Sequence, residues 1–383
     1  MTSSRPRTTR RFLWGGLVAV AIVAAYASRV RGGMVDFAVN YRAGQRLEAG
    51  ETLYQRADGH YMFKYLPASA LIYLPFSHLP IEFAKATWFA LSLLLLAASF
   101  ALILQLVPLP HRPYLLLVSV LVLAKYFLHE LRLGQINILV TTLMLLATSA
   151  LSRRAEPGSD AAAGALVGIA TALKPYAALF FPYFLLTRNW TAAAAGVAVL
   201  AIALWVPAVF YGSDGNVQVL REWAVTLSQS TPGQLTNNDN VSVFGFFAKW
   251  LATPTGALLA SAMVLAILAL LMLAVILRHG KARNPATLEC AMLLTLVPLV
   301  SPLGWDYTFL MSLLAVALLI NAFDTFPKPV RVILTVNFAV IALAVFDVMG
   351  RRAYSAYMQW SVTTVNFLIV VVALAYLRFR AEL

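Results

Sequence analysis

The sequence predicts an all-α membrane protein whose chain crosses the bilayer many times. Apolar residues make up 61% of its 383 residues and charged residues only 12%, and the mean hydropathy is +0.78. A soluble protein of this length needs a larger polar surface. Apolar runs of helical length recur along the chain, whereas the short alternating strands of a membrane β-barrel do not.

Twelve apolar runs have roughly the length that a membrane-spanning helix requires. One shorter run, 67–79, is bounded by Pro67 and Pro80, and it predicts a re-entrant or interfacial segment instead of a span. The twelve predicted spans are 12–30, 83–107, 113–129, 136–151, 161–174, 175–188, 191–211, 256–278, 286–302, 303–322, 331–349 and 360–378.

The basic residues support this threading. If the N-terminal arginines are cytoplasmic, alternating spans place basic residues in each later cytoplasmic connection, as the positive-inside rule favours. The 29 basic and 16 acidic residues, a net charge of +13, therefore indicate membrane orientation and not a nucleic acid partner. The basic groups assigned to the cytoplasm are Arg112, Arg153, Arg154, Arg188, residues 278–283, Lys328, Arg331, Arg378 and Arg380.

The first apolar run has two interpretations. It resembles a secretory signal peptide, in which Ala25 and Ala27 would form the cleavage motif. A retained anchor helix, with its arginines held in the cytoplasm, agrees better with the remaining spans. We therefore expect a multi-pass protein of the cytoplasmic (inner) membrane with a cytoplasmic N-terminus.

The same threading places the unusual polar segments on the outer face. We expect one membrane domain, 1–383, with a first outer loop at 31–66 that contains an interfacial helix, and a second large outer loop at 212–240. Charged or helix-breaking residues at span ends cost free energy, so their convergence on one face indicates a polar cavity there. The outer segments are 34–67, 129–137, 172–176, 212–240, 301–308 and 350–357.

The first outer segment contains a carboxylate directly after the first span. Residues 36–49 have helical character, and Gly50 is a suitable end for that helix. Asp36 is either a catalytic base or a cap for the first N–H groups of the helix. Arg42 and Arg46 share a helix face, which suits anionic headgroups or a lipid-linked phosphate, but a solvated basic face is an equal alternative.

Other outer polar residues also have two interpretations. Lys174, which precedes Pro175, is either a phosphate ligand in a membrane cavity or a snorkelling side chain. The cluster of Arg132, Gln135 and Asn137 is either functional or the capped start of a helix. The remaining candidates are Trp305 and Tyr307, for sugar stacking or an aromatic belt, and the asparagine-rich stretch 237–240, for hydrogen bonding or a turn.

Several other chemistries find no support in the sequence. There is no phosphate-binding loop of the Walker type and no serine nucleophile elbow. Cys290 is the only cysteine, so an intrachain disulfide is excluded. The histidines show no metal-ligand spacing, and they are His60, His78, His111, His129 and His279.

An ordered set of short motifs resembles glycosyltransferase family 87, a group of polyprenol-phosphate-sugar-dependent transferases with the GT-C membrane fold. The motifs occur in the family's order over most of the chain. They are DFAVNYRAGQRLEAGETLY (36–54), FKYLPASALIYLPF (63–76), GQINIL (134–139), ALKPY (172–176), NVSVFGFF (240–247) and SPLGWDYT (301–308). The resemblance implies a GT-C-type bundle of about twelve helices with an interfacial helix after the first span.

The resemblance also implies an activity and roles for particular residues. Such enzymes transfer a sugar, here mannose or a related hexose or pentose, from a polyprenyl-phosphate donor to an acceptor hydroxyl at the outer face. Asp36 matches the family's general base, and direct displacement inverts the anomeric configuration. The expected ligands of the donor phosphate are Lys174, Arg132, Arg351 and Arg352, and the expected substrate-binding residues are Asn40, Tyr41, Tyr65, Gln135, Asn137, Asn240, Trp305, Asp306 and Tyr307.

The expected partners are the lipid bilayer, the polyprenyl-phosphate-linked sugar and a glycolipid or glycan acceptor. The interpretation requires no nucleic acid, no metal and no cofactor beyond the donor substrate. The chain departs from the family where many members carry a histidine after the SPxxW motif, since Tyr307 and Thr308 occupy those positions. The alternatives are a transporter or flippase for a lipid-linked sugar and a non-catalytic membrane scaffold.

Overall fold

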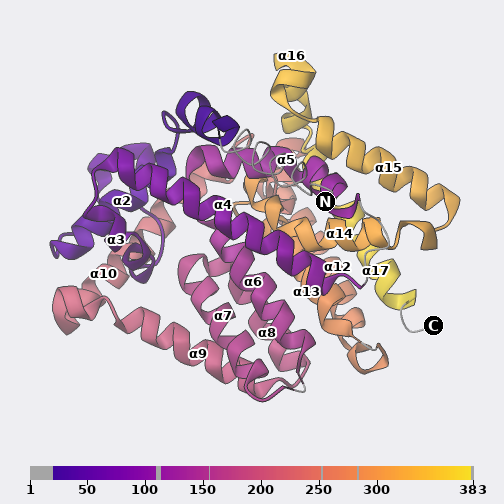
Figure 1. The fold of residues 1–383 in the computed structure, drawn as a ribbon, viewed down its shortest axis with the longest axis horizontal. Coiled ribbons are helices and arrows are strands. Elements are labelled where there is room, and N and C mark those ends of the chain that lie inside the picture. Colours follow the sequence, from indigo (N-terminus) through magenta and orange to yellow (C-terminus); the bar gives the residue numbers. More distant parts are fainter. Residues whose placement is uncertain (1–19, 109–113, 155, 252, 283, 381–383) are drawn as a thin grey trace, which may run out of the picture.

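The computed structural model describes residues 20–108, 114–154, 156–251, 253–282 and 284–380, which form a helical bundle (Figure 1). Apart from one isolated β-bridge between Asn240 and Trp305, the described residues contain helices and turns only. The α-helices are α2 (Val35–Glu48), α3 (Leu74–Ser77), α4 (Ile81–Leu106), α5 (Leu115–Leu133), α6 (Asn137–Ser152), α7 (Ser159–Leu173), α8 (Phe180–Leu186), α9 (Trp190–Trp205), α10 (Ala208–Ser230), α11 (Val243–Trp250), α12 (Pro254–Ile276), α13 (Pro285–Val300), α14 (Leu313–Asn321), α15 (Lys328–Leu343), α16 (Phe346–Gln359) and α17 (Val362–Arg380).

The apolar runs of the sequence correspond closely to these helices. The predicted span 83–107 is α4, the span 256–278 is α12, and the span 360–378 is α17. The first run is described only from Val20, from which a helix continues to Val30. The all-α prediction is confirmed, and the chain is a multi-pass helical membrane protein.

The helices differ from the prediction in length. Among the residues described, only α4, α12 and α17 are long and apolar enough to cross a membrane alone. The number of spans rises to five if the bent pairs α9–α10 and α15–α16 each count as one span. The other apolar helices, such as α6 and α13, have about 16 residues. A helix of that length rises about 24 Å, less than the ~30 Å of a hydrocarbon core. The described residues therefore do not contain twelve full-length spans.

Small residues allow α7 and α9 to pack closely. Gly164 and Gly168 lie four residues apart on α7, and Gly168 faces Gly196 on α9. A Cβ atom on Gly164 would lie 2.0 Å from the carbonyl oxygen of Ala192, and one on Gly168 would lie 2.6 Å from that of Gly196. This spacing of small residues lets two membrane helices approach until their backbones are in contact.

Replacing Gly164 by Val is expected to destabilise the protein by ~2–3 kcal/mol, because the larger side chain must force α7 away from α9. The midpoint of thermal unfolding in detergent measures the effect. Ala162→Val is the matched control, since Ala162 is exposed on the same helix. Equal midpoints for the two variants would contradict the close packing.

The segment predicted to form the first outer loop is ordered by side-chain contacts. Arg46 on α2 donates to both carboxylate oxygens of Asp58, and also to Gln55 Oε1 at 3.0 Å. The hydrogen bond from this guanidinium holds the pKa of the Asp58 carboxyl below its ordinary value. Arg42 is exposed, so the two arginines that share a face in the sequence have different surroundings. Arg46 thus has a structural partner within the chain.

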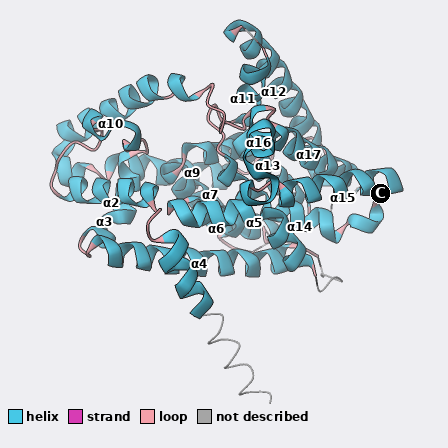
Figure 2. Cartoon of the chain, turned by 90° about the horizontal axis from the view of Figure 1, so that it is seen from above, coloured by secondary structure: helices cyan, strands magenta, loops and turns pink. Residues whose placement is uncertain are grey.

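The segment expected to form the second large outer loop is mainly helical. A bend of 91° separates α9 from the helix that follows, and Gly212 within α10 has φ 69°. Figure 2 shows α10 on the same side of the molecule as α2 and α3. Trp223 Nε1 donates to the carbonyl of Lys64 at 3.2 Å, and Tyr211 donates to that of Glu51 at 2.8 Å. The polar composition of 212–230 therefore reflects a surface helix packed over residues 51–64.

The turns between spans bring the predicted outer motifs together. A 3₁₀-helix at Pro67–Tyr73, followed by α3, packs against α2, in agreement with a short re-entrant or interfacial segment. The α5–α6 turn lies against the start of α2, where the Met34 N–H donates to the Arg132 carbonyl at 2.7 Å. The end of α7 and the 3₁₀-helix Asp306–Ser312 complete this region, in which the candidate site lies.

Candidate active site

Asp36 lies in the first turn of α2, and its carboxylate points toward the α5–α6 turn. The helix begins after Met34, whose backbone is in the left-handed region, and no side chain caps the N-terminus by a hydrogen bond. The carboxylate instead accepts a hydrogen bond from Gln135 Nε2, with Asp36 Oδ2 at 2.9 Å. The hydrogen bonding therefore favours a role in the site over the helix-cap alternative.

A glycine permits the close approach that this contact needs. Gly134 ends α5 with φ 67°, a conformation that favours glycine. A Cβ atom at Gly134 would lie 2.7 Å from the Cβ atom of Phe37. Because Gly134 has no side chain, α2 can approach the turn closely enough for Gln135, the next residue, to bind Asp36.

The Gln135 side chain connects four groups of the site. Its Nε2 atom donates to Asp36 and lies 3.4 Å from the hydroxyl of Tyr307. Its Oε1 atom accepts from the Tyr65 hydroxyl at 3.3 Å and from Lys174 Nζ at 3.4 Å. Because an amide has donors at one end and an acceptor at the other, Gln135 separates a side with the carboxylate from a side with the cation.

Lys174 is buried within this cluster. Its backbone is extended, as expected for a residue before a proline, and it ends α7. The side chain is 8% exposed, and Nζ donates to the Tyr65 hydroxyl at 2.9 Å and lies 4.3 Å from the centroid of the same ring. A snorkelling side chain would extend to the surface, whereas Lys174 bonds to groups inside the site.

A second polar layer supports the cluster from α5, α6 and the segment after α7. Glu130 is 1% exposed and accepts from Asn137 Nδ2 at 2.8 Å and from the Ile138 N–H at 3.2 Å. The Tyr176 hydroxyl donates to Asn137 Oδ1. Both ends of the Asn137 amide are therefore bound within the protein. Glu130 and Tyr176 are not among the residues predicted from the sequence, although both lie in segments predicted to be on the outer face.

His129 and Asp306 form a pair beside Tyr307. His129 Nδ1 lies 3.0 Å from Asp306 Oδ1, and the same oxygen accepts from the Tyr307 N–H at 2.7 Å. The His129 ring packs edge-on against the Tyr307 ring, with centroids 5.3 Å apart. His129 is not among the site residues predicted from the sequence, and the signal that could have identified it is its place at the start of the polar segment 129–137.

At Tyr307 and Thr308, where the chain lacks the family's histidine, the imidazole of His129 from another helix lies against the Tyr307 ring. Tyr307 and Thr308 are both buried in the 3₁₀-helix that follows the SPLGW motif. His129 comes from α5 and contacts Tyr307 from outside that helix. The structure therefore places a histidine next to the altered motif, although the motif itself contains none.

Some predicted substrate-binding residues are bound to backbone groups instead. Asn40 Nδ2 donates to the Asp36 carbonyl at 2.9 Å, and the Tyr41 hydroxyl donates to the Leu79 carbonyl at 2.8 Å. Asn240 is fully buried, and its Nδ2 atom donates to the carbonyls of Leu235 and Pro302 at 3.0 Å. These contacts give the three residues structural roles around the site. Trp305 is half-buried and forms the β-bridge with Asn240.

The predicted phosphate ligands also lie in different surroundings. Lys174 is in the cluster, whereas the side chain of Arg132 is exposed on α5. Arg351 and Arg352 are exposed on α16, which follows α15 after a bend of 103°. The structure therefore brings Asp36, Tyr65, Gln135, Lys174 and Tyr307 together and leaves these arginines outside that cluster.

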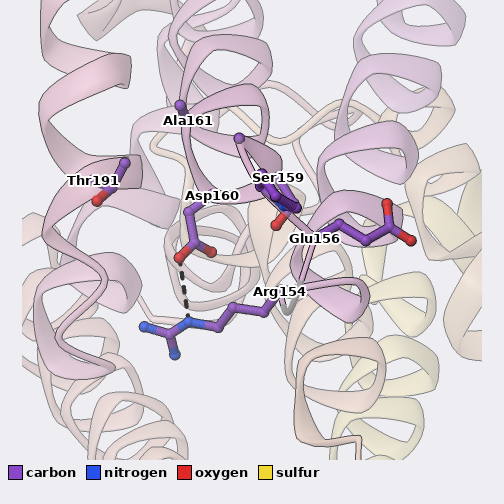
Figure 3. A pocket seen from close by; sticks show the side chains of 8 residues that line it. Arg154, Glu156, Ser159, Asp160, Ala161 and Thr191 are labelled. Atoms are coloured by element: carbon purple, nitrogen blue, oxygen red, sulfur yellow. Dashed lines mark hydrogen bonds and ion pairs between the residues drawn. The ribbon is translucent and has the colours of Figure 1, made fainter.

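A separate cavity lies at the opposite end of α6. It has a volume of about 300 Å³, and Figure 3 shows the Arg154 side chain extending to Asp160, whose Oδ2 lies 3.3 Å from Arg154 Nε. Because α6 begins near Gln135 and ends at Ser152, this cavity is about one helix length from the cluster. It belongs to the other side of the bundle, on the side that the charge pattern assigns to the cytoplasm.

The chain is similar to known glycosyltransferases. A curated polyprenol-phosphate-mannose-dependent alpha-(1-2)-phosphatidylinositol mannoside mannosyltransferase of Mycobacterium tuberculosis (strain ATCC 25618 / H37Rv) is 31% identical over 176 residues. The match covers 42% of this chain, which spans 40% of that relative. ArnT from Cupriavidus metallidurans, crystallised with undecaprenyl phosphate, aligns over 98% of this chain and 76% of its own, with 15% identity and a TM-score of 0.44.

The family comparison covers more than half of the chain. Residues 63–302 match the description "Glycosyltransferase family 87". This range contains four of the motifs in full, from 63–76 to 240–247, together with Gln135, Lys174 and all of the second polar layer. The chain belongs to glycosyltransferase family 87.

Proposed function

We propose that this protein transfers a sugar from a polyprenyl-phosphate donor to an acceptor hydroxyl, with Asp36 as the general base. One observation supports this proposal above all others: Asp36 and Lys174 bind the two ends of the Gln135 side chain. A sugar transfer from a lipid phosphate needs a base for the acceptor and a cation for the departing phosphate. The cluster contains both groups, separated by one amide.

Asp36 has the geometry of a base for the acceptor. Among the described residues, Gln135 is the side chain that hydrogen-bonds the carboxylate, and it does so at Oδ2. The other carboxylate oxygen is thus left to accept a hydrogen bond from the acceptor hydroxyl. As that hydroxyl attacks the anomeric carbon, its proton passes to the carboxylate. The bond from the anomeric carbon to the phosphate oxygen breaks in the same step, so the configuration inverts.

Lys174 is the cation that we assign to the leaving phosphate. Negative charge develops on the phosphate as the glycosidic bond breaks, and a positioned ammonium stabilises that charge in a site shielded from water. The phosphate is stable as an anion, so the leaving group needs no general acid. Tyr65, which accepts a hydrogen bond from Lys174 at 2.9 Å, keeps the ammonium in place.

The proposed location is the outer face of the cytoplasmic membrane, with a cytoplasmic N-terminus. The distribution of basic residues in the sequence supports this orientation. The curated relative is named for a polyprenol-phosphate-mannose donor, which supports mannose or a related sugar as the transferred group. We propose a lipid or glycan as the acceptor.

Transfer of radiolabelled sugar tests the proposal directly. Purified protein in detergent is incubated with polyprenyl-phosphate mannose and a membrane lipid extract, and labelled products are separated by thin-layer chromatography. We expect a labelled product that depends on both the protein and the lipid extract. Movement of the intact donor across vesicle membranes, without any new glycosidic bond, would instead identify a flippase and overturn the proposal.

A further inference from the structure

One face of α5 combines basic and exposed apolar side chains. Lys125, His129 and Arg132 are spaced i, i+4 and i+7, so they project from the same side of the helix. Arg132 is exposed, and the His129 side chain is 42% exposed. Leu121 and Leu128 flank these residues and are 56% and 66% exposed. Such a surface is complementary to a ligand that has hydrocarbon chains and an anionic headgroup.

Lys125 lies at the end of this surface that is farther from the α5–α6 turn. Its Nζ atom donates to the carbonyl of Ala344 at 3.1 Å, at the end of α15. The ammonium also lies 4.8 Å from the ring centroid of Tyr126 and 5.1 Å from that of Tyr357. These contacts occupy Lys125, so on this face of α5 the basic side chains that remain to bind a ligand are His129 and Arg132.

Asp306 orients His129 toward such a ligand. The carboxylate holds ring atom Nδ1 at 3.0 Å, and in the imidazolium form Nε2 then provides a second N–H donor. Three acidic residues face His129, and each has a different situation. Asp306 is paired with the ring, and Glu130 is buried and bound to Asn137 and Ile138. Asp239 is exposed in the loop that precedes α11.

The position of His129 relative to Gln135 indicates which substrate this surface serves. His129 contacts Tyr307, and the Tyr307 hydroxyl lies 3.4 Å from Gln135 Nε2, the atom that also binds Asp36. Lys174 lies at the other end of the amide. In a direct displacement the attacking hydroxyl and the leaving phosphate lie on opposite sides of the anomeric carbon. The surface is therefore on the side of the base, where the acceptor must bind.

We propose that His129 and Arg132 form a subsite for the phosphate of an anionic lipid acceptor, whose hydrocarbon chains lie along Leu121 and Leu128. The proposal rests on the proposed function, because it uses Asp36 to define the acceptor side. It separates two phosphate sites, with the donor phosphate at Lys174 and the acceptor phosphate at α5. Charge-assisted hydrogen bonds from both side chains supply the affinity.

Lipid binding to the full-length chain in detergent, measured by native mass spectrometry, tests this subsite. The probes are dioleoyl phosphatidylglycerol, dioleoylglycerol, which has the same chains without the phosphate, and a polyprenyl phosphate. We expect the variant with both His129→Gln and Arg132→Gln to bind phosphatidylglycerol at least ~10-fold more weakly and to retain the polyprenyl phosphate. Lys174→Met is expected to show the opposite pattern, and dioleoylglycerol is expected to bind weakly throughout.

Two controls keep the test decisive. Arg221→Gln removes an exposed arginine from α10 and is expected to bind phosphatidylglycerol as the unmodified protein does. Arg132→Gln alone, at an exposed position, covers the case in which the double variant does not fold. The proposal would be overturned if the His129 and Arg132 variants bound phosphatidylglycerol as the unmodified protein does. It would also be overturned if these variants lost binding of the polyprenyl phosphate and kept that of phosphatidylglycerol. Since binding is measured without turnover, a failure of sugar transfer would be recognised separately.

Discussion

Replacing Asp36 by Asn is expected to lower the rate of sugar transfer by at least ~100-fold, the usual contribution of a general base. Asparagine keeps the size of the side chain but cannot take the proton of the acceptor hydroxyl. The hydrogen bond from Gln135 can still form to the amide oxygen, so the local structure is expected to persist. Initial rates at saturating donor and acceptor measure the effect.

Asp214→Asn provides the matched control for this experiment. Asp214 is an exposed aspartate on α10, so its replacement removes one negative charge without touching the cluster. We expect its transfer rate to equal that of the unmodified protein. A folded Asp36→Asn variant that keeps full activity would contradict the role of Asp36 as the base and leave it a structural role at the start of α2.

Replacing Lys174 by Met is expected to lower turnover by about 100-fold, as the loss of a group that stabilises developing charge does in other enzymes. Methionine fills nearly the same volume but carries no charge. Binding of the polyprenyl-phosphate donor is expected to weaken as well, because the ammonium attracts the phosphate before the reaction. The rate as a function of donor concentration separates these two effects.

The Lys174 variant needs a test of folding, since the ammonium also attracts the buried carboxylate of Glu130. Loss of one partner leaves the other charge buried, which destabilises a protein. The unfolding midpoint is therefore measured for each variant. Lys85→Met is the control, because Lys85 is a mostly buried lysine of α4 whose partner is Glu82. If a folded Lys174→Met protein turns over normally, Lys174 is not the phosphate ligand.

The helices of this protein were predictable because a single physical effect defines them. Backbone groups in a membrane must be hydrogen-bonded within the protein, so apolar runs of sufficient length become helices. The ends of α4, α12 and α17 lie within a few residues of the predicted spans for this reason. The actual length of each membrane helix was less predictable, because apolar residues also fill the interior of a bundle.

The segment 212–240 shows where composition misleads. A helix that lies on the surface of a bundle has polar residues on its outer side, so its average composition resembles that of a loop. In α10, Val219 is the buried member of a small apolar cluster shared with α2 and the segment after it, and Phe210, Tyr211 and Trp223 pack against that cluster. Its buried residues are Asn216, Val219 and Thr226, two of them polar, so the apolar pattern is too weak to distinguish such a helix from a loop.

The sequence by itself determined the class of protein, the helical segments, the polar motifs between them and Asp36 as the candidate base. Only the tertiary structure showed that Gln135, 99 residues from Asp36 in the chain, joins the carboxylate to Lys174. It also decided that His129 pairs with Asp306, 177 residues away, and that Asn240 binds backbone groups. Apolar periodicity is a local property of the chain and can be found in a single segment. A hydrogen bond between side chains depends on how distant turns pack, and no single segment contains that information.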